Sequence, residues 1–392
     1  MRTPAYFIVV AAWVGAAGVW RPGGALAAAE IKIVHIDVGQ GDATLILGPS
    51  GGGGARVSVL VDAGNIPRGG NPDGGKIVGA ALRENAVTRL DYFIATHYDA
   101  DHLGGAITGD GQMHGTSFIL GQDNVPGAPG DDDGDQAADW LDEHPAVMVT
   151  PDPEELGAGD DVAVRHFVDR GDDGAPSTQT FRKYRALAAA KPESRISLTT
   201  QEQVDNFEID LGSGASLMCL AANGLVRGGA QRVANVNTEN EKSLCFLLRH
   251  GGFDYLIGGD TIGRSFGGEN AEVEAAIGEF VHGQNLNVDV LHVNHHGANN
   301  ASESGFLANI APEVAVISLG NGNPHHHPND EALDRLVEAG VYRIYQTEWG
   351  TTRGETSENV RRRQAIFQGD IVITSDGFGF DIATSRHFPV DD

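Results

Sequence analysis

Four side chains that commonly bind metals lie close together in the sequence, at His97, Asp99, Asp101 and His102. They follow an apolar run over 90–96, which predicts a buried strand. A regular helix or strand would spread these groups over different faces, so we expect a tight loop that turns them toward one point. Imidazole together with carboxylate suits zinc, manganese or iron. General acid–base chemistry and a solvated acidic turn are the alternatives.

Similar apolar runs recur along the chain and supply the elements that would position this loop. They predict strands at 31–37, 43–47, 57–61, 215–220, 243–248, 253–257, 288–293, 314–318, 341–346 and 371–374. Amphipathic segments predict helices at 76–85, 181–190, 271–281 and about 330–339. Strands followed by helices in both halves indicate two sheets, each covered by helices. We interpret the acid-, Pro- and Gly-rich segment 109–214 as a long insertion.

The amino terminus predicts export. Arg2 precedes an apolar stretch over 6–20, and small residues at 25–29 offer cleavage sites, which is typical of a signal peptide at 1–29. An uncleaved membrane anchor is the alternative. We expect a secreted or periplasmic protein with one domain at 30–392 and no stable membrane span after cleavage. In an exported protein, Cys219 and Cys245 could form a disulfide, and two buried thiols on neighbouring strands are the alternative.

The charge balance restricts the partners of the chain. Its 392 residues include 27 Lys and Arg against 54 Asp and Glu, a formal net charge of −27. A field of this sign repels phosphate backbones, so strong duplex nucleic-acid binding is not expected. The same field attracts divalent cations and is compatible with a phosphate ester held by a metal.

The motifs, taken in order, resemble the metallo-β-lactamase superfamily, whose signature is His-x-His-x-Asp-His after a strand. Here the signature reads His97-x-Asp99-x-Asp101-His102, with aspartate in the third position. Further segments resemble the branch that holds the extracytoplasmic hydrolase domains of ComEC-type DNA-uptake proteins and related secreted esterases. They lie at 37–42, 60–64, 257–260, 293–297 and 323–328. The resemblance implies a four-layer αββα sandwich with a long insertion at about 109–214.

Carried over position by position, the resemblance implies a centre of one or two zinc ions, with manganese possible. The implied ligands are His97 and Asp99 for the first metal, Asp101, His102 and His296 for the second, and Asp260 between both. Aspartate at position 99 makes the first site more anionic and shifts the preference slightly toward manganese. Family members often supply another histidine from the middle of the chain. Here Asn240 and Ser243 resemble the polar motif of the ComEC-type branch instead.

Other polar residues would serve the ligands or the reaction. The resemblance implies that Asp62 orients a ligand imidazole. Asp37 and Asp42 are expected to play similar parts, with turn capping as the alternative for both. The candidate catalytic residues are Asp101, His295, His325 and His327. The three histidines would contact substrate or transfer protons, and His295 or His325 could protonate the leaving oxygen. For the last two histidines, a purely structural turn is the alternative.

The resemblance implies a secreted metal-dependent hydrolase, and its branch favours a phosphodiesterase that uses a metal-bridged hydroxide. Metal binding lowers the pKa of water from 15.7 toward about 7, which creates a nucleophile at neutral pH. The expected substrate is a small-molecule or polymer phosphodiester. Hydrolysis of a lactam, lactone or thioester on the same site is one alternative. A non-catalytic secreted binding protein that retains the scaffold is another.

Overall fold

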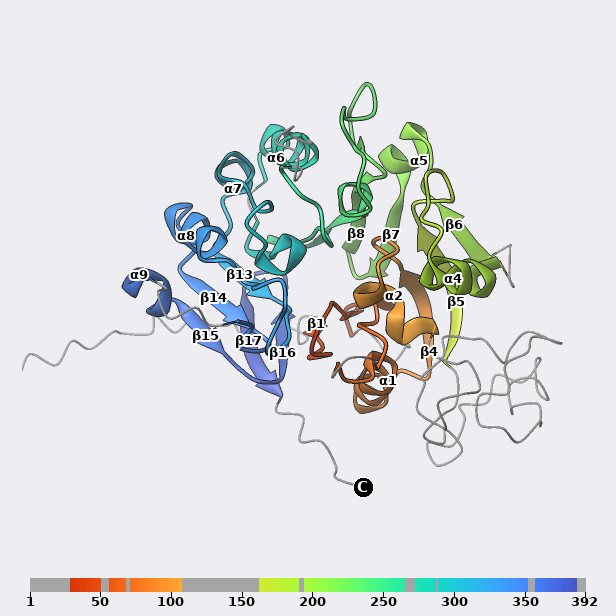
Figure 1. Ribbon diagram of the computed structural model, residues 1–392, viewed down its shortest axis with the longest axis horizontal. Coiled ribbons are helices and arrows are strands. Elements are labelled where there is room, and N and C mark those ends of the chain that lie inside the picture. The colour runs from red at the N-terminus through yellow and green to blue at the C-terminus, as the bar shows by residue number, and fades with distance from the viewer. Residues whose placement is uncertain are drawn as a thin grey trace, which may run out of the picture.

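The computed structural model describes residues 29–50, 56–67, 71–107, 162–189, 194–264, 272–286, 288–351 and 357–385. Two β-sheets pack face to face, with helices on the outer side of each (Figure 1). Nearly all of the expected signal peptide, 1–28, and the first half of the expected insertion, 109–161, lie outside the described residues.

The first sheet is antiparallel from β17 to β3 and parallel from β3 to β6. Its eight described strands, in spatial order, are β17 (Phe380–Ser385), β16 (Asp370–Ser375), β1 (Ile31–His35), β2 (Thr44–Leu47), β3 (Ser58–Val61), β4 (Arg89–Ile94), β5 (Ala163–Asp169) and β6 (Arg195–Ser197). Because β3 and β4 are parallel, their carboxyl ends meet at one edge of the sheet.

The second sheet is parallel from β15 to β11 and antiparallel from β11 to β7. Its described strands, in spatial order, are β15 (Gln364–Ile366), β14 (Arg343–Gln346), β13 (Val314–Ile317), β12 (Val290–His292), β11 (Phe253–Ile257), β10 (Cys245–His250), β8 (Ala215–Ala222) and β7 (Glu208–Gly212), with β9 (Leu225–Val226) paired to β8. The loops after β11, β12 and β13 therefore leave the sheet on the same edge.

Helices cover the outer faces of both sheets (Figure 1). They are α1 (Gly74–Glu84), α2 (Ala100–Ile107), α4 (Gln179–Ala189), α5 (Gln201–Asn206), α6 (Val273–Gly283), α7 (Ser304–Ile310), α8 (Asp330–Glu338) and α9 (Glu358–Arg361). No helix among them combines the length and hydropathy that crossing a lipid bilayer requires.

Three separate hydrophobic cores confirm the expected four-layer αββα architecture. One lies between the first sheet and α1, α2 and α4, one between the two sheets, and one between the second sheet and α6, α7 and α8. Successive strand residues point to opposite faces. In β2, Leu45 therefore packs toward the helices while Ile46 packs toward the other sheet. Both faces of each sheet are buried, which explains the continuous apolar runs in the sequence.

Part of the segment interpreted as an insertion belongs to the sandwich itself. Residues 162–189 and 194–214 contribute β5 and β6 to the first sheet and β7 to the second. β6 and β7 are edge strands with partly exposed side chains. These strands contain few apolar residues and therefore resemble loop sequence. Their polar residues lie on the solvent-facing side of an edge strand.

The two cysteines are free, buried thiols on neighbouring strands, β8 and β10. Cys219 packs in the core between the sheets, whereas Cys245 packs in the core beneath α6 and α7. The two side chains thus lie on opposite faces of one sheet, which matches the thiol alternative and not the disulfide.

Candidate metal centre

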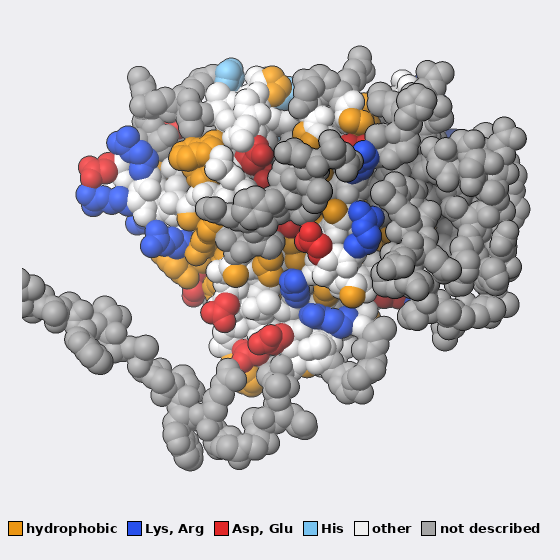
Figure 2. All heavy atoms as spheres, turned by 90° about the horizontal axis from the view of Figure 1, so that it is seen from below, with side chains coloured by type: hydrophobic (Ala, Val, Ile, Leu, Met, Phe, Trp, Pro, Cys, Tyr) orange, Lys and Arg blue, Asp and Glu red, His pale blue; other side chains and the backbone are white. Residues whose placement is uncertain are grey.

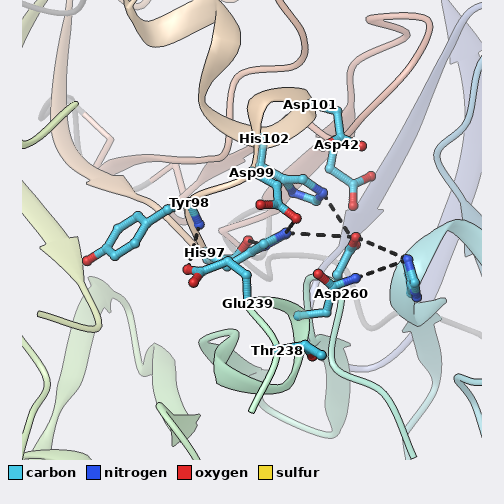
Figure 3. Close-up of polar contacts among 12 residues, drawn as sticks. Asp42, His97, Tyr98, Asp99, Asp101, His102, Thr238, Glu239 and Asp260 are labelled. Carbon is cyan, nitrogen blue, oxygen red and sulfur yellow. Dashed lines mark hydrogen bonds and ion pairs between the residues drawn. The ribbon is translucent and has the colours of Figure 1, made fainter. Parts of the chain in front are cut away.

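Side chains able to bind a metal gather where strands of both sheets end. His97 and Asp99 lie in the loop after β4, and Asp260 follows β11. His296 lies after β12 in a short 3-10 segment, Asn294–Gly297. Figure 3 shows the side chains of His97, His102 and Asp42 arranged around Asp260. Parallel strands that share an edge bring these distant parts of the sequence to one place.

Two of the four clustered ligands lie on a helix, which corrects the expectation of a loop. α2 begins at Ala100, so Asp101 and His102 occupy its first turn. The helix can form so close to the site because it carries glycine where the chain after β3 passes. A Cβ atom on Gly105 would lie 2.1 Å from the carbonyl oxygen of Ala63.

Asp62 orients two imidazoles from the end of β3. Its Oδ2 accepts a hydrogen bond from Nδ1 of His102 at 2.7 Å. The same carboxylate accepts from the backbone N–H of Thr96 at 2.9 Å and from its hydroxyl at 2.6 Å. The Thr96 hydroxyl lies 3.1 Å from Nδ1 of His97 and accepts from it. Both histidines therefore turn Nε2 toward Asp260.

His296 is oriented in the same way from the second sheet. Its Nδ1 donates to the carbonyl oxygen of Ser318 at 3.0 Å, which directs Nε2 toward the site. That Nε2 lies 3.5 Å from Oδ1 of Asp260 and 3.7 Å from Oδ2 of Asp101. His295 and His296 have left-handed backbone, with φ of 51° at both. This tight turn lets two adjacent imidazoles face the site.

The donor set fits a divalent cation. Asp42, His102, Asp260 and His296 each offer a buried ligand atom, and these atoms all lie within 4.8 Å of one another. The Nε2 atoms of His97, His102 and His296 and Oδ1 of Asp260 are buried with no hydrogen-bond partner. An unsatisfied buried polar atom costs about 1–3 kcal/mol, and several such atoms pointing at one place fit a central cation. Nitrogen and oxygen donors suit zinc or manganese.

The charges of these groups are strongly coupled. Burial opposes ionisation of Asp260, but the imidazoles of His102 and His296 outweigh it and hold the pKa of this carboxyl well below its usual range. Burial also opposes protonation of His296, and the carboxylates of Asp260 and Asp42 outweigh it and raise its pKa to about 10. A metal that binds here must displace these imidazole protons, so binding should release protons.

The histidines predicted to contact substrate lie beside the ligands. The ring of His327 is 5.4 Å from that of His295 and 6.2 Å from that of His296, between centroids. Burial and the neighbouring charge of His296 lower the pKa of His327 to about 3. His325 stacks on His327 at 5.9 Å and is exposed. A line of imidazoles thus runs from the metal centre to solvent.

The acidic residues Asp37 and Asp42 lie in different surroundings. Asp37 accepts from the backbone N–H of Gly39, as a turn-capping acid does. Asp42, weighed as an orienting or turn-capping acid, lies among the ligand atoms instead. Gly41 has φ of 110°, and the N–H of Asp42 donates to the carbonyl oxygen of Asp101 at 3.2 Å. This contact between distant segments has no signal in the local sequence.

A buried ion pair supports the loop after β4 and was not foreseen from the sequence. Arg170 is fully buried, and its guanidinium makes hydrogen bonds to both carboxylate oxygens of Glu239. Glu239 also accepts from the backbone N–H of Tyr98 at 3.1 Å, and Figure 3 shows these two residues next to His97. Arg170 lies 4.4 Å from the centre of the Tyr98 ring. These contacts fix the chain between the candidate ligands His97 and Asp99.

No protein-family model matches the chain. It is similar to three curated proteins of bacteria. ComE operon protein 3 of Bacillus subtilis is 28% identical over 115 residues, which cover 29% of this chain and 13% of that protein. Competence protein ComA of Neisseria gonorrhoeae is 34% identical over 103 residues, covering 26% and 14%. Recombination protein 2 of Haemophilus influenzae is 39% identical over 49 residues, covering 12% and 6%. The matches therefore span only a small part of these longer proteins.

Among solved structures, a diphosphatase of the PhnP family is 12% identical and covers 88% of this chain and 97% of its own, with a TM-score of 0.35. The ordered motifs, the αββα sandwich and the sequence relatives together make this chain similar to ComEC-type, metallo-β-lactamase-like proteins, and it carries a candidate divalent-metal site.

Proposed function

We propose that this chain is a metal-dependent hydrolase that cleaves phosphodiesters. The observation that carries the proposal is the convergence of three unpartnered Nε2 atoms, those of His97, His102 and His296, on Asp260. Each imidazole is fixed by a hydrogen bond through Nδ1, so its Nε2 atom is oriented in advance. The metallo-β-lactamase-like class supports hydrolysis, and its ComEC-type branch favours the phosphodiester bond.

The residues divide between two metal positions around the central carboxylate. Asp101, His102 and His296 would hold one ion, with Asp42 in reach, and His97 with Asp99 would hold the other. When bound, such ions lower the pKa of water and neutralise charge that develops on phosphoryl oxygens. Zinc is the proposed ion, and manganese is the alternative.

The imidazoles of His327 and His325, next to the proposed ligands, would accept and donate protons during the reaction. His327 is held neutral by burial beside His296, so it would accept a hydrogen bond rather than give up a proton. His325 is exposed and stacked on His327, where it can exchange protons with solvent and pass one to a leaving oxygen.

The substrate is proposed to be a small-molecule or polymer phosphodiester. The names of the sequence relatives, competence and recombination proteins, favour a nucleic acid among polymers. The net charge of −27 disfavours strong duplex binding. On the face shown in Figure 2, the described Lys and Arg side chains lie among Asp and Glu side chains. A short or single-stranded substrate that reaches the metals suits this surface better than a long duplex.

An activity panel tests the proposal. The purified protein is analysed for bound metal and assayed with added zinc or manganese on bis(p-nitrophenyl) phosphate, a chromogenic lactam, a thioester and single-stranded and duplex oligonucleotides. Phosphodiester turnover that Asp101→Asn and His296→Ala abolish, together with metal, is expected. His282→Ala, an exposed histidine on α6, is the matched control. Full activity in both site variants would refute the assignment of the metal ligands. Turnover of the lactam or the thioester, without turnover of any phosphodiester, would show that the bond cleaved is not a phosphodiester.

Export is proposed from the sequence at 1–29, which signals secretion or transfer to the periplasm. Expression of the full chain in a bacterial host, followed by fractionation and amino-terminal sequencing, tests it. A mature amino terminus near residue 30 in the exported fraction is expected. A full-length product in the cytosol would contradict the signal-peptide assignment.

A further inference from the structure

Asp260 faces two pairs of imidazoles with its two oxygen atoms. Oδ1 lies 3.3 Å from Nε2 of His102 and 3.5 Å from Nε2 of His296. Oδ2 lies 3.9 Å from Nε2 of His97 and 3.8 Å from Nε2 of His295. The side chain is only 4% exposed. One carboxylate therefore divides the site into two halves, each with one oxygen and two imidazole nitrogens.

The half around Oδ2 gains a fourth donor from the loop after β4. Oδ2 of Asp99 lies 3.7 Å from Nε2 of His97, on the open side of the site where Asp99 is 44% exposed. Nε2 of His97 is buried without a hydrogen-bond partner, whereas Nε2 of His295 has one partner, the side-chain amide of Asn240. Two nitrogen and two oxygen donors match the four-coordinate preference of zinc.

His295 is held with its Nε2 toward this half. Nδ1 lies 3.2 Å from Oδ1 of Asn300 and donates to it, which leaves the lone pair on Nε2. The backbone N–H of His295 donates to the carbonyl oxygen of Gly259 at 3.1 Å. That bond ties the imidazole directly to the segment that carries Asp260. The 3-10 turn thus presents the imidazoles of His295 and His296 to opposite halves of one carboxylate.

We propose that His295 completes the first metal position through Nε2, in the place where related chains use a histidine from the middle of the sequence. The proposal deepens the proposed function and rests on it. It assigns His295 to the metal instead of to the leaving group, the role expected from the sequence. The ligand set of this position is then His97, Asp99, Asp260 and His295.

The side-chain amide of Asn240 competes with a metal for Nε2 of His295. Its Nδ2 lies 3.1 Å from Nε2 of His295 and donates to the same lone pair that a metal would take. Metal binding must break this hydrogen bond and release the amide into the site. Removing the amide should therefore tighten the first position without touching the second.

Zinc titration against a chromophoric chelator tests the assignment. The wild-type protein is expected to bind two zinc ions. His295→Ala should weaken one of them by more than the roughly 10- to 100-fold that loss of an outer hydrogen bond costs, and should leave the other unchanged. Asn240→Ala should tighten the weaker ion about five-fold. His282→Ala, exposed on α6, should bind as the wild type does.

The outcomes separate this proposal from the proposed function. Two zinc ions with unchanged affinities in His295→Ala would overturn the ligand role, even if turnover falls, because His295 would then act on substrate. A single zinc in a wild-type protein that still cleaves phosphodiesters would also overturn it and leave the proposed function standing. The Asn240→Ala arm excludes a folding artefact, because a folding defect cannot tighten metal binding. Unchanged affinity in Asn240→Ala counts against the proposal as well.

Discussion

Asp62→Asn should weaken metal binding although Asp62 contacts no metal position itself. The carboxylate accepts three hydrogen bonds, two from Thr96 and one from His102. An asparagine amide has one oxygen, so its NH2 group must replace either Oδ2, which faces Nδ1 of His102 and the hydroxyl of Thr96, or Oδ1, which faces the backbone N–H of Thr96. In the first case His102 carries its hydrogen on Nε2, the wrong tautomer for a ligand. In the second the NH2 group opposes the backbone N–H of Thr96, which loses its acceptor next to His97.

The magnitude follows from outer-shell contacts of this kind, whose loss weakens metal binding about 10- to 100-fold, or about 1.4–2.7 kcal/mol. Chelator competition with zinc measures it, and thermal unfolding of the same samples shows that the variant is folded. Asp91→Asn is the matched control, because Asp91 links β4 to Ser58 of β3 at the opposite end of the strands. It should change stability and leave zinc affinity unchanged. Wild-type zinc affinity in Asp62→Asn would refute the orienting role.

Three further predictions concern stability. EDTA should lower the Tm of the wild type, since a bound metal at 100 times its Kd adds about 2.7 kcal/mol to the free energy of unfolding. In scanning fluorimetry, EDTA should lower the Tm of His296→Ala by less. Equal decreases in Tm for the two proteins would contradict a metal site at His296. Burial raises the pKa of Glu274 from 4.5 to about 7, so the folded state binds more protons between these pH values and stability falls by about 3 kcal/mol as pH rises. Glu274→Gln should lack this slope in urea titrations, and parallel profiles would disprove it. Gly105→Ala places a Cβ 2.1 Å from the carbonyl oxygen of Ala63 and should lower the free energy of unfolding by about 1–3 kcal/mol or more. Gly283→Ala is the control, because its Cβ would meet nothing within 4 Å. Similar urea midpoints for the two variants would contradict the close approach at Gly105.

The elements buried on both faces were predictable from the sequence. β13 is an uninterrupted apolar run, β4 and β11 are mostly apolar, and the ends of all three place the following polar residues at the edge of a sheet. The edge strands β6 and β17 were missed because their side chains are only partly buried, with Asp381 and Ala383 of β17 exposed, and their local composition resembles a loop. Burial on two sides leaves a strong pattern, whereas burial on one side of a short strand does not.

The site was predictable where a ligand belongs to a dense motif. His97 and His102 are close in sequence, and their spacing alone indicates a metal. Asp42 was predictable only as a polar residue in a turn, because its place among the ligands depends on the contact of its backbone with α2. The pair of Arg170 and Glu239 joins segments far apart in the chain, and only the assembled sheets bring them together.

The left-handed turn at His295 and His296 limits which ligands this loop can ever offer. With φ of 51° at both positions and 77° at Gly297, β-branched and bulky residues are disfavoured, while Asn, Asp and His tolerate this backbone. Substitutions that keep the turn therefore exchange imidazole for carboxylate or amide oxygen and for little else. The backbone therefore favours exchange of nitrogen donors for oxygen donors. Such variants would shift the preference of the candidate site from the proposed zinc toward manganese or magnesium, while the rest of the sandwich stays the same.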